Sequence, residues 1–114
     1  CLIYSVETQW QNMPRDDRKK LIGEYLAFTD DIRKSGHYLG SNPLDPTSTA
    51  STVRVKNGEV TVTDGPFAET REQLGGYFLI EARDTVDAIH VASRIPGARF
   101  GCIEVRPIVQ MDEP

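Results

Sequence analysis

Residues 77–108 read YFLIEARDTVDAIHVASRIPGARFGCIEVRPI, and this stretch predicts a strand, a helix and a second strand. Residues 77–82 are almost continuously apolar, which is typical of a strand buried on both faces. Asp84 is expected to cap the helix, and Asp87 supplies a carboxylate to its first turn. Pro96-Gly97 ends the helix, and residues 101–108 form the last strand. The residues expected on the inner side of the helix are Val86, Ile89 and Ser93, with Ala88, Ala92 and Ile95 beside them.

The first half of the chain has the same order of elements. Residues 1–6, CLIYSV, predict a strand. Pro14 opens a helix that Gly36 ends, because proline suits a first helical turn and glycine suits a helix C-terminus. Residues 37–40 predict a second strand, and residues 41–49, which contain two prolines, predict a loop. The apolar stripe of this helix is formed by Leu21, Tyr25, Phe28 and Ile32.

Residues 53–63 predict a β-hairpin. Valines at positions 53, 55, 60 and 62 alternate with polar residues, as they do in a strand. Asn57-Gly58 lies between the two runs and readily adopts the positive φ angles of a tight type I′ turn. Asp64-Gly65-Pro66-Phe67 predicts a second turn directly after the hairpin.

The order of the predicted elements is strand, helix, strand, hairpin, strand, helix, strand. Without the hairpin this is a βαββαβ unit, so the expected fold class is α+β, a ferredoxin-like plait. Its two helices cover one face of the sheet, whereas the strand at residues 77–80 is apolar on both faces. A second subunit is the simplest cover for the other face. We therefore expect a homodimer whose two sheets face each other.

Composition favours one folded domain over residues 1–114. The chain weighs 12.7 kDa, and its 39% hydrophobic and 26% charged residues exclude a disordered chain. The formal charge is −4 without a basic cluster, so nucleic-acid binding is not expected. No apolar run approaches the roughly 20 residues of a membrane span. No signal peptide is visible, so a cytoplasmic location is expected.

The two cysteines, Cys1 and Cys102, are too few for a disulfide framework and lack the spacing of zinc ligands. Cys102 lies in an apolar segment and is predicted to be a core thiol. The two histidines fall on separate elements, so no metal site is expected. The sequence has no phosphate-binding loop and no dinucleotide fingerprint, and no cofactor is expected.

Residues 62–80, VTDGPFAETREQLGGYFLI, resemble the signature of the DGPF family, also described as YciI-like or YCII-related. Thr52-Val-Arg54, Ile95-Pro96 and Glu104-Val-Arg-Pro107 resemble the same family. The resemblance covers residues 1–108. It implies a dimeric α/β barrel built on a ferredoxin-like plait.

The resemblance also implies several functions. Many family members are encoded near sigma factors. Simpler relatives carry a His-Asp pair in a pocket, and at least one relative is a dehydrochlorinase that releases HCl from a chlorinated ring lactone. The helical His of those relatives aligns with Tyr25, and their Asp aligns with Ile95, so this chain departs from the pair at both positions.

Three residues are candidates for catalysis: Asp64, His37 and Tyr25. The Asp64 carboxylate could act as a general base, or could accept backbone amide hydrogen bonds that order residues 64–76 at the pocket mouth. His37 could move a proton near pH 7, or could pack at the surface. Tyr25 could donate its hydroxyl to a substrate oxygen, or could complete the core.

Three further residues are candidates for ligand binding: Arg106, Glu104 and Arg71. Arg106 could bind an acidic ligand, or could neutralise Glu104 on the last strand. Arg71 belongs to a charge cluster that is typical of a solvated face. This cluster precedes Gly75-Gly76, which permits a close approach of another backbone segment.

These residues support three hypotheses. The first is a small-molecule-binding or lyase-like protein that has a pocket between the facing sheets of a dimer. It would use Asp64, His37 and Tyr25. The second is a non-catalytic regulatory or partner-binding module, which the resemblance links to a sigma factor. The third is a dimer that binds no ligand.

Overall fold

The computed structural model describes residues 1–111. The strands are β1 (Leu2–Ser5), β2 (Tyr38–Pro43), β3 (Ser51–Lys56), β4 (Glu59–Asp64), β5 (Gln73–Ile80) and β6 (Cys102–Glu104). The helices are α1 (Glu7–Gln11), α2 (Arg15–Lys34) and α3 (Thr85–Ser93), with short 3-10 turns η1 (Thr47–Thr49) and η2 (Pro96–Arg99).

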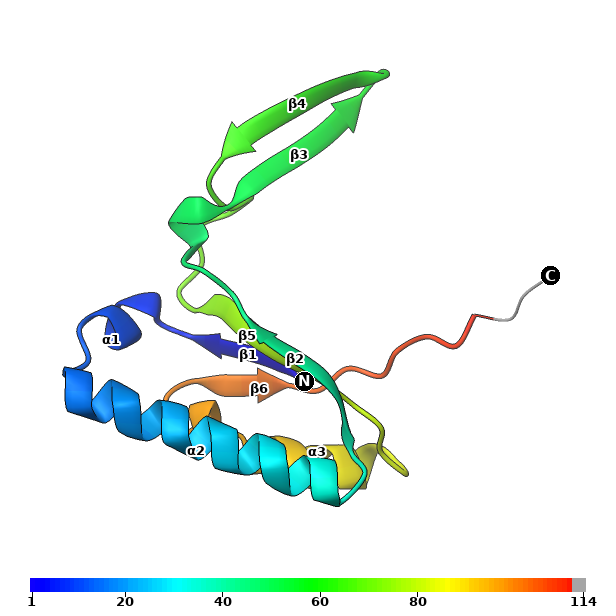
Figure 1. Cartoon of the computed structure of the whole chain (residues 1–114). Coiled ribbons are helices and arrows are strands. Elements are labelled where there is room, and N and C mark those ends of the chain that lie inside the picture. Colours follow the sequence, from blue (N-terminus) through cyan, green and yellow to red (C-terminus); the bar gives the residue numbers. More distant parts are fainter. Residues whose placement is uncertain (112–114) are drawn as a thin grey trace.

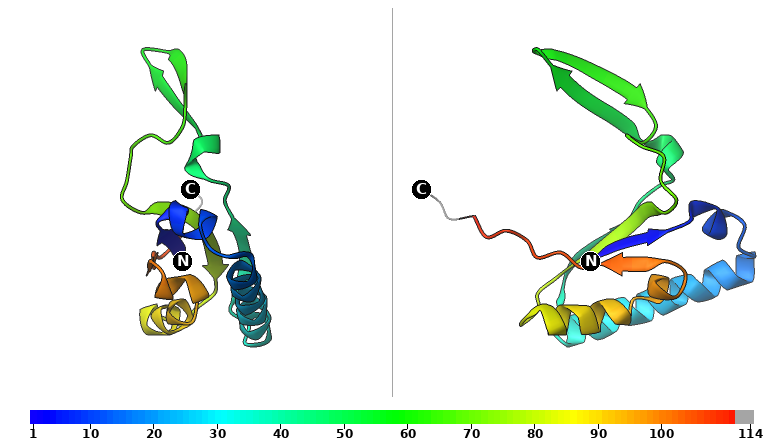
Figure 2. Two further views of the ribbon diagram at one scale, coloured as in Figure 1. Left: turned by 90° about the vertical axis from the view of Figure 1, so that its left-hand side faces the viewer. Right: turned by 180° about the vertical axis from the view of Figure 1, so that it is seen from behind.

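Four strands form one antiparallel sheet in the order β2-β5-β1-β6, and β3 and β4 form a separate two-stranded sheet. Helices α2 and α3 lie together on one side of the four-stranded sheet (Figures 1 and 2). The predicted α+β class is therefore confirmed. The strand order and the two helices on one face are compatible with a ferredoxin-like plait.

Helix α2 begins directly after Pro14, as predicted. Acidic residues occupy its first turn and basic residues its last turn, where each sign of charge is favoured by the helix dipole. Phe28 and Ile32 point from α2 into the core, where they meet Phe78 of β5. The Phe28 and Phe78 rings pack edge to face with centroids 5.2 Å apart. The predicted stripe is confirmed at its buried members, and Tyr25 is half-buried.

The Asp84 cap of α3 is confirmed, since its carboxylate accepts a hydrogen bond of 2.8 Å from the Asp87 backbone N–H. The predicted inner line of Val86, Ile89 and Ser93 is wrong, whereas Ala92 and Ile95, predicted beside it, are buried. Val86 and Ile89 are 76% and 53% exposed, whereas Val91 is 1% exposed. Asp87 and Val91 are four residues apart and share one face of α3, and Ile95 lies just beyond the helix at the start of η2. On that face Val91 packs in the core and Asp87 pairs with His37.

Some strand limits differ from the predictions. Strand β5 starts at Gln73 because β1 pairs Ser5 with Gln73, and β2 continues into the predicted loop and pairs Pro43 with Gly76. Strand β6 ends at Glu104, and the predicted core position of Cys102 is wrong because this residue is exposed. Successive residues of a strand alternate between faces, and Ile103 is the residue that packs against the core.

The β3–β4 hairpin projects from the body as an arm (Figure 1). At its tip, Asn57 and Gly58 have φ angles of 52° and 80°, which confirms the predicted turn with two positive φ angles. The radius of gyration is 16.6 Å, compared with about 13 Å for a compact domain of this size. The arm accounts for this extended shape. None of the helices within residues 1–111 combines the length and the hydrophobicity that a membrane crossing requires.

Candidate functional site

A cavity of about 650 Å³ lies between α1, α2 and the four-stranded sheet. Ile3 and Phe78, which contact it from the sheet, also belong to the core that packs under α2. The cavity therefore lies on the helix side of the sheet. The pocket expected from the sequence was on the opposite, open face. Other apolar residues that line it are Trp10, Leu21, Ile22, Leu26, Leu44 and Phe100.

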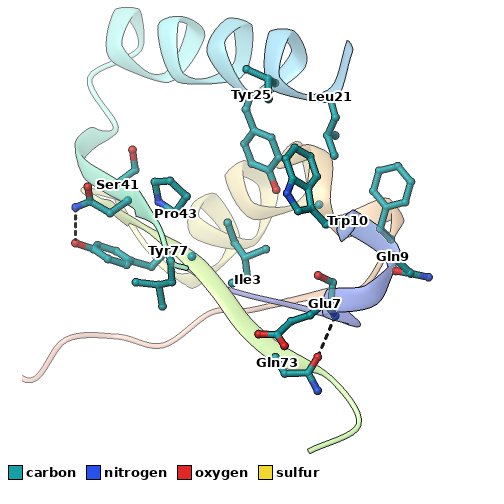
Figure 3. Close-up of a pocket in the computed structure, with 18 of the residues that line it drawn as sticks. Ile3, Glu7, Gln9, Trp10, Leu21, Tyr25, Ser41, Pro43, Gln73 and Tyr77 are labelled. Carbon is teal, nitrogen blue, oxygen red and sulfur yellow. Dashed lines mark hydrogen bonds between the residues drawn. The ribbon is translucent and has the colours of Figure 1, made fainter. Parts of the chain in front are cut away.

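Tyr25 projects from α2 into this cavity (Figure 3). Its hydroxyl lies against Gly97 in η2, where an added Cβ would overlap it. Burial raises the pKa of Tyr25 above its ordinary value of 10.0, and a hydrogen bond to the Gly97 backbone and the charge of Arg99 oppose only part of this rise. The side chain is therefore a neutral phenol at pH 7, with a proton to donate.

Trp10 stands at the rim of the cavity on the short helix α1, and its side chain is 43% exposed. Glu7 anchors this helix. Its carboxylate accepts hydrogen bonds from the Thr47 backbone N–H at 2.6 Å and from the Thr47 hydroxyl at 2.9 Å. The Glu7 N–H donates to the side chain of Gln73 at 3.0 Å (Figure 3). The Arg18 guanidinium lies 6.0 Å from the centre of the Trp10 ring and connects α1 to α2.

The polar groups around the cavity are mostly neutral and already paired. Asn42 donates from its amide to the Tyr77 hydroxyl at 2.9 Å, which leaves the proton of that hydroxyl free to be donated. Glu7 and Asp45 are the carboxylates among the described lining residues, and Glu7 is committed to Thr47. The cavity can therefore hold a mostly apolar molecule, and Tyr25 can donate a hydrogen bond to an acceptor atom on it.

The structure does not bring the three predicted catalytic residues together. Tyr25 lines the cavity, whereas neither His37 nor Asp64 is among its lining residues. His37 instead pairs with Asp87, with 3.0 Å between Nε2 and Oδ2. The Ser35 hydroxyl lies 2.7 Å from Nδ1 of the same ring. His37 is therefore held at the end of α2 and the start of β2, against the first turn of α3.

Asp64 is exposed at the end of β4, and its carboxylate has no hydrogen-bond partner among residues 1–111. The prediction that this carboxylate accepts backbone amide bonds is therefore wrong. The turn is held by Gly65, whose N–H donates to the Ala50 oxygen at 2.7 Å. The Thr52 hydroxyl in turn donates to the Gly65 oxygen at 2.9 Å.

The three predicted ligand-binding residues also lie outside the cavity lining. Arg106 and Glu104 form an exposed ion pair, with 3.6 Å between Nε and Oε2. This is the mutual neutralisation that the sequence left as an alternative. Arg71 is exposed. In the described part of the chain, no group of three His, Cys, Asp or Glu residues is placed to hold a metal ion.

Sequence reasoning missed two features of this region. The first is the partnership of His37 with Asp87, which are 50 residues apart. The available signal was the placement of Asp87 in the first turn of the helix that follows β5. The second is Gly97, which the sequence presents as a helix stop and which the structure places against the Tyr25 hydroxyl. The expected close approach at Gly75-Gly76 is found at Gly76, beside the backbone of Asn42.

The whole chain resembles known sequences. A protein of Rhizobium meliloti (strain 1021), described as uncharacterized, is 32% identical over 109 residues, which are 94% of this chain and 88% of that protein. The YCII-related domain family matches residues 1–112. The chain therefore belongs to the YCII-related domain family.

Proposed function

We propose that the protein binds a flat, mostly apolar small molecule that carries a hydrogen-bond acceptor. The observation that carries this proposal is the Tyr25 hydroxyl, a neutral donor inside a mostly apolar cavity of about 650 Å³. Sites for small molecules typically have this size and combine an apolar lining with a few polar groups that fix orientation. Trp10 at the rim offers a ring that can cover the bound molecule.

Binding is favoured over a lyase reaction because proton abstraction needs a base that faces the substrate. His37 is paired with Asp87 away from the cavity, and Asp64 lies on the arm. Glu7, a carboxylate of the lining, is already held by two hydrogen bonds from Thr47. Asp45, the other carboxylate of the described lining, is exposed to solvent, so the described lining offers the Tyr25 hydroxyl as a donor without an enclosed base beside it.

A matched pair of probes tests the proposal. 1-Tetralone is a flat aromatic ketone, and tetralin is the same bicycle without the carbonyl oxygen. Nuclear magnetic resonance titrations should show both probes shifting signals of residues around Tyr25 and Trp10. We expect 1-tetralone to bind about fivefold more tightly, since a hydrogen bond contributes about 1 kcal/mol net. Tyr25→Phe should abolish this difference and leave the affinity for tetralin unchanged.

Two results would contradict the proposal in different ways. If neither probe binds at millimolar concentration, the cavity is not a site for this class of molecule. If both bind equally to the wild-type protein, or if Tyr25→Phe preserves a preference for 1-tetralone, the hydroxyl is not the recognising group. Thr61→Ser, on the arm and remote from the lining residues, is the control variant.

We also propose that the protein is a homodimer in which the open sheet face meets that of a second copy. Leu39 of β2 and Leu79 of β5 are 56% and 37% exposed. No helix of the described chain covers this face (Figure 2). Light scattering at micromolar concentration should give twice the chain mass of 12.7 kDa. A monomer under these conditions would contradict the arrangement.

A further inference from the structure

The arm carries an apolar face made entirely of valine. Val53 pairs with Val62 and Val55 pairs with Val60, so the four side chains lie on one side of the hairpin. They are 60–66% exposed. The polar residues Arg54, Lys56 and Thr61 alternate with them and lie on the other side. This alternation is the pattern of a strand pair with one face buried and one face solvated.

The chain itself leaves the valine face uncovered. Among the described residues, β3 and β4 pack against each other and make only isolated contacts with other helices and strands. The base of the arm is nevertheless fixed, because the Thr52 hydroxyl and the Ala50 oxygen both bind Gly65. A two-stranded hairpin without packing on a third element is marginally stable at best in water. The arm therefore requires a surface that its own body does not provide.

The amount of exposed surface agrees with a missing partner. The chain exposes 8824 Å², whereas a folded monomer of this mass exposes about 6,200 Å². The excess is about three times the roughly 800 Å² that each partner buries in an ordinary stable interface. Leu39 and Leu79, at the β2 edge of the open sheet face, form a second uncovered apolar surface on the same chain.

We propose that the arm is an exchanged dimer element. Its valine face packs over Leu39 and Leu79 on the β2 side of a second copy's open sheet face, beside the region where β1 and β6 of the two facing sheets meet, and the arm of that copy packs in the same way in return. A second copy is the occupant because each chain offers both uncovered surfaces. A twofold axis then buries both valine faces and both leucine surfaces in one closed dimer. The inference deepens the proposed dimer by assigning the arm to its interface, and it is independent of ligand binding in the cavity.

The test replaces the four valines together by threonine, at positions 53, 55, 60 and 62. Threonine keeps the β-branched shape and the strand preference, so the hairpin itself is retained and only the apolar contact is lost. The control variant carries Arg54→Thr and Lys56→Thr, on the opposite side of the same arm. Light scattering over a concentration series measures dimerisation, and hydrogen exchange measures protection of the amides of residues 53–62.

We expect a wild-type dimer whose arm amides are protected from exchange. The quadruple variant should raise the dimer dissociation constant at least tenfold and expose the arm amides, whereas the control should behave as the wild type. Leu39→Asn should also expose the arm amides, whereas Val86→Asn, at a 76% exposed position of α3, should not.

Failure of this proposal is distinguishable from failure of the dimer. The exchanged arm would be contradicted by a wild-type dimer whose arm amides are unprotected. It would also be contradicted by a quadruple variant that dimerises as tightly as the wild type. Neither result would contradict the dimer with facing sheets. A wild-type protein that stays monomeric would overturn both.

Discussion

His37 and Asp87 connect the two halves of the fold: the imidazole Nε2 lies 3.0 Å from the Asp87 carboxylate oxygen Oδ2. An ionised carboxylate can only accept, so Nε2 donates this hydrogen bond. The same carboxylate oxygen accepts from the Arg83 backbone N–H at 3.0 Å. The pair thus joins the turn after α2 to the first turn of α3.

The position of the pair follows from the register of the sheet. Tyr38 of β2 pairs with Ile80 of β5, and the Glu81 N–H donates to the His37 oxygen at 2.8 Å. The residue before β2 is therefore brought to the segment that leads from β5 into α3. Side chains of the pair are 19% and 9% exposed, which shields the interaction from solvent.

Acid stability should depend on Asp87. The Arg83 backbone N–H, followed by the His37 side chain, lowers the pKa of Asp87 below its ordinary value of 3.8. A lowered folded-state pKa stabilises the folded protein at pH values above 3.8, and this contribution is lost as the pH falls through the folded-state pKa. Asp87→Asn should therefore lower the melting temperature at pH 7 and flatten the decline of stability below pH 4.

Thermal denaturation followed by circular dichroism between pH 7 and pH 2.5 measures this effect. Asp30→Asn is the matched control, because Asp30 is an exposed carboxylate on α2 whose ion pair with Lys34 is solvated. If the melting temperature falls equally steeply at acidic pH in the wild type and in Asp87→Asn, the pair has no stabilising role.

Gly97→Ala should destabilise the protein by about 1–3 kcal/mol, the usual cost of an added methyl group in a packed site. The new Cβ would overlap the Tyr25 hydroxyl and would lie 3.1 Å from a methyl carbon of Ile3. Removing the hydroxyl should relieve the overlap, so Gly97→Ala should cost less in a Tyr25→Phe background. Urea denaturation of the four proteins in this cycle gives the coupling energy. A coupling energy of zero would show that the two groups do not touch.

The turn at the base of the arm should depend on Thr52 and not on Asp64. Thr52→Val removes the hydroxyl that donates to the Gly65 oxygen, and we expect a loss of about 1 kcal/mol. Asp64→Ala removes an exposed carboxylate without a partner among residues 1–111, and stability should change by less than about 0.5 kcal/mol. Urea denaturation measures both variants, and the reverse order of effects would contradict this account.

Glu7 should control the position of Trp10. Glu7→Gln weakens the two hydrogen bonds from Thr47, which involve a charged acceptor, and we expect a loss of about 1–2 kcal/mol. Trp10 is the single tryptophan of the chain, so its fluorescence reports on α1 directly. The emission should shift to longer wavelength as α1 loosens. Glu59→Gln at the tip of the arm should leave the emission unchanged, and an unshifted spectrum in Glu7→Gln would show that this anchor does not hold α1.

The sequence by itself determined the local features of this protein. Helix α2 follows from the spacing of its apolar residues and from Pro14, the hairpin turn follows from Asn57-Gly58, and the start of α3 follows from Asp84. Each of these depends on residues within a few positions of one another, where φ preferences, capping and helical periodicity act.

Tertiary structure alone decided which sides these elements bury and where the cavity forms. Val91, rather than Val86, is buried because its face of α3, which also carries Asp87 opposite His37, packs on the core. The cavity lies under α2, where it is lined by Tyr25 and by Gly97, which is 72 positions away in the sequence. Such contacts depend on the register of strands that are distant in sequence. A periodic pattern predicts that a helix or strand has an apolar face. Which other helix or strand packs on that face depends on the strand register of the assembled sheet.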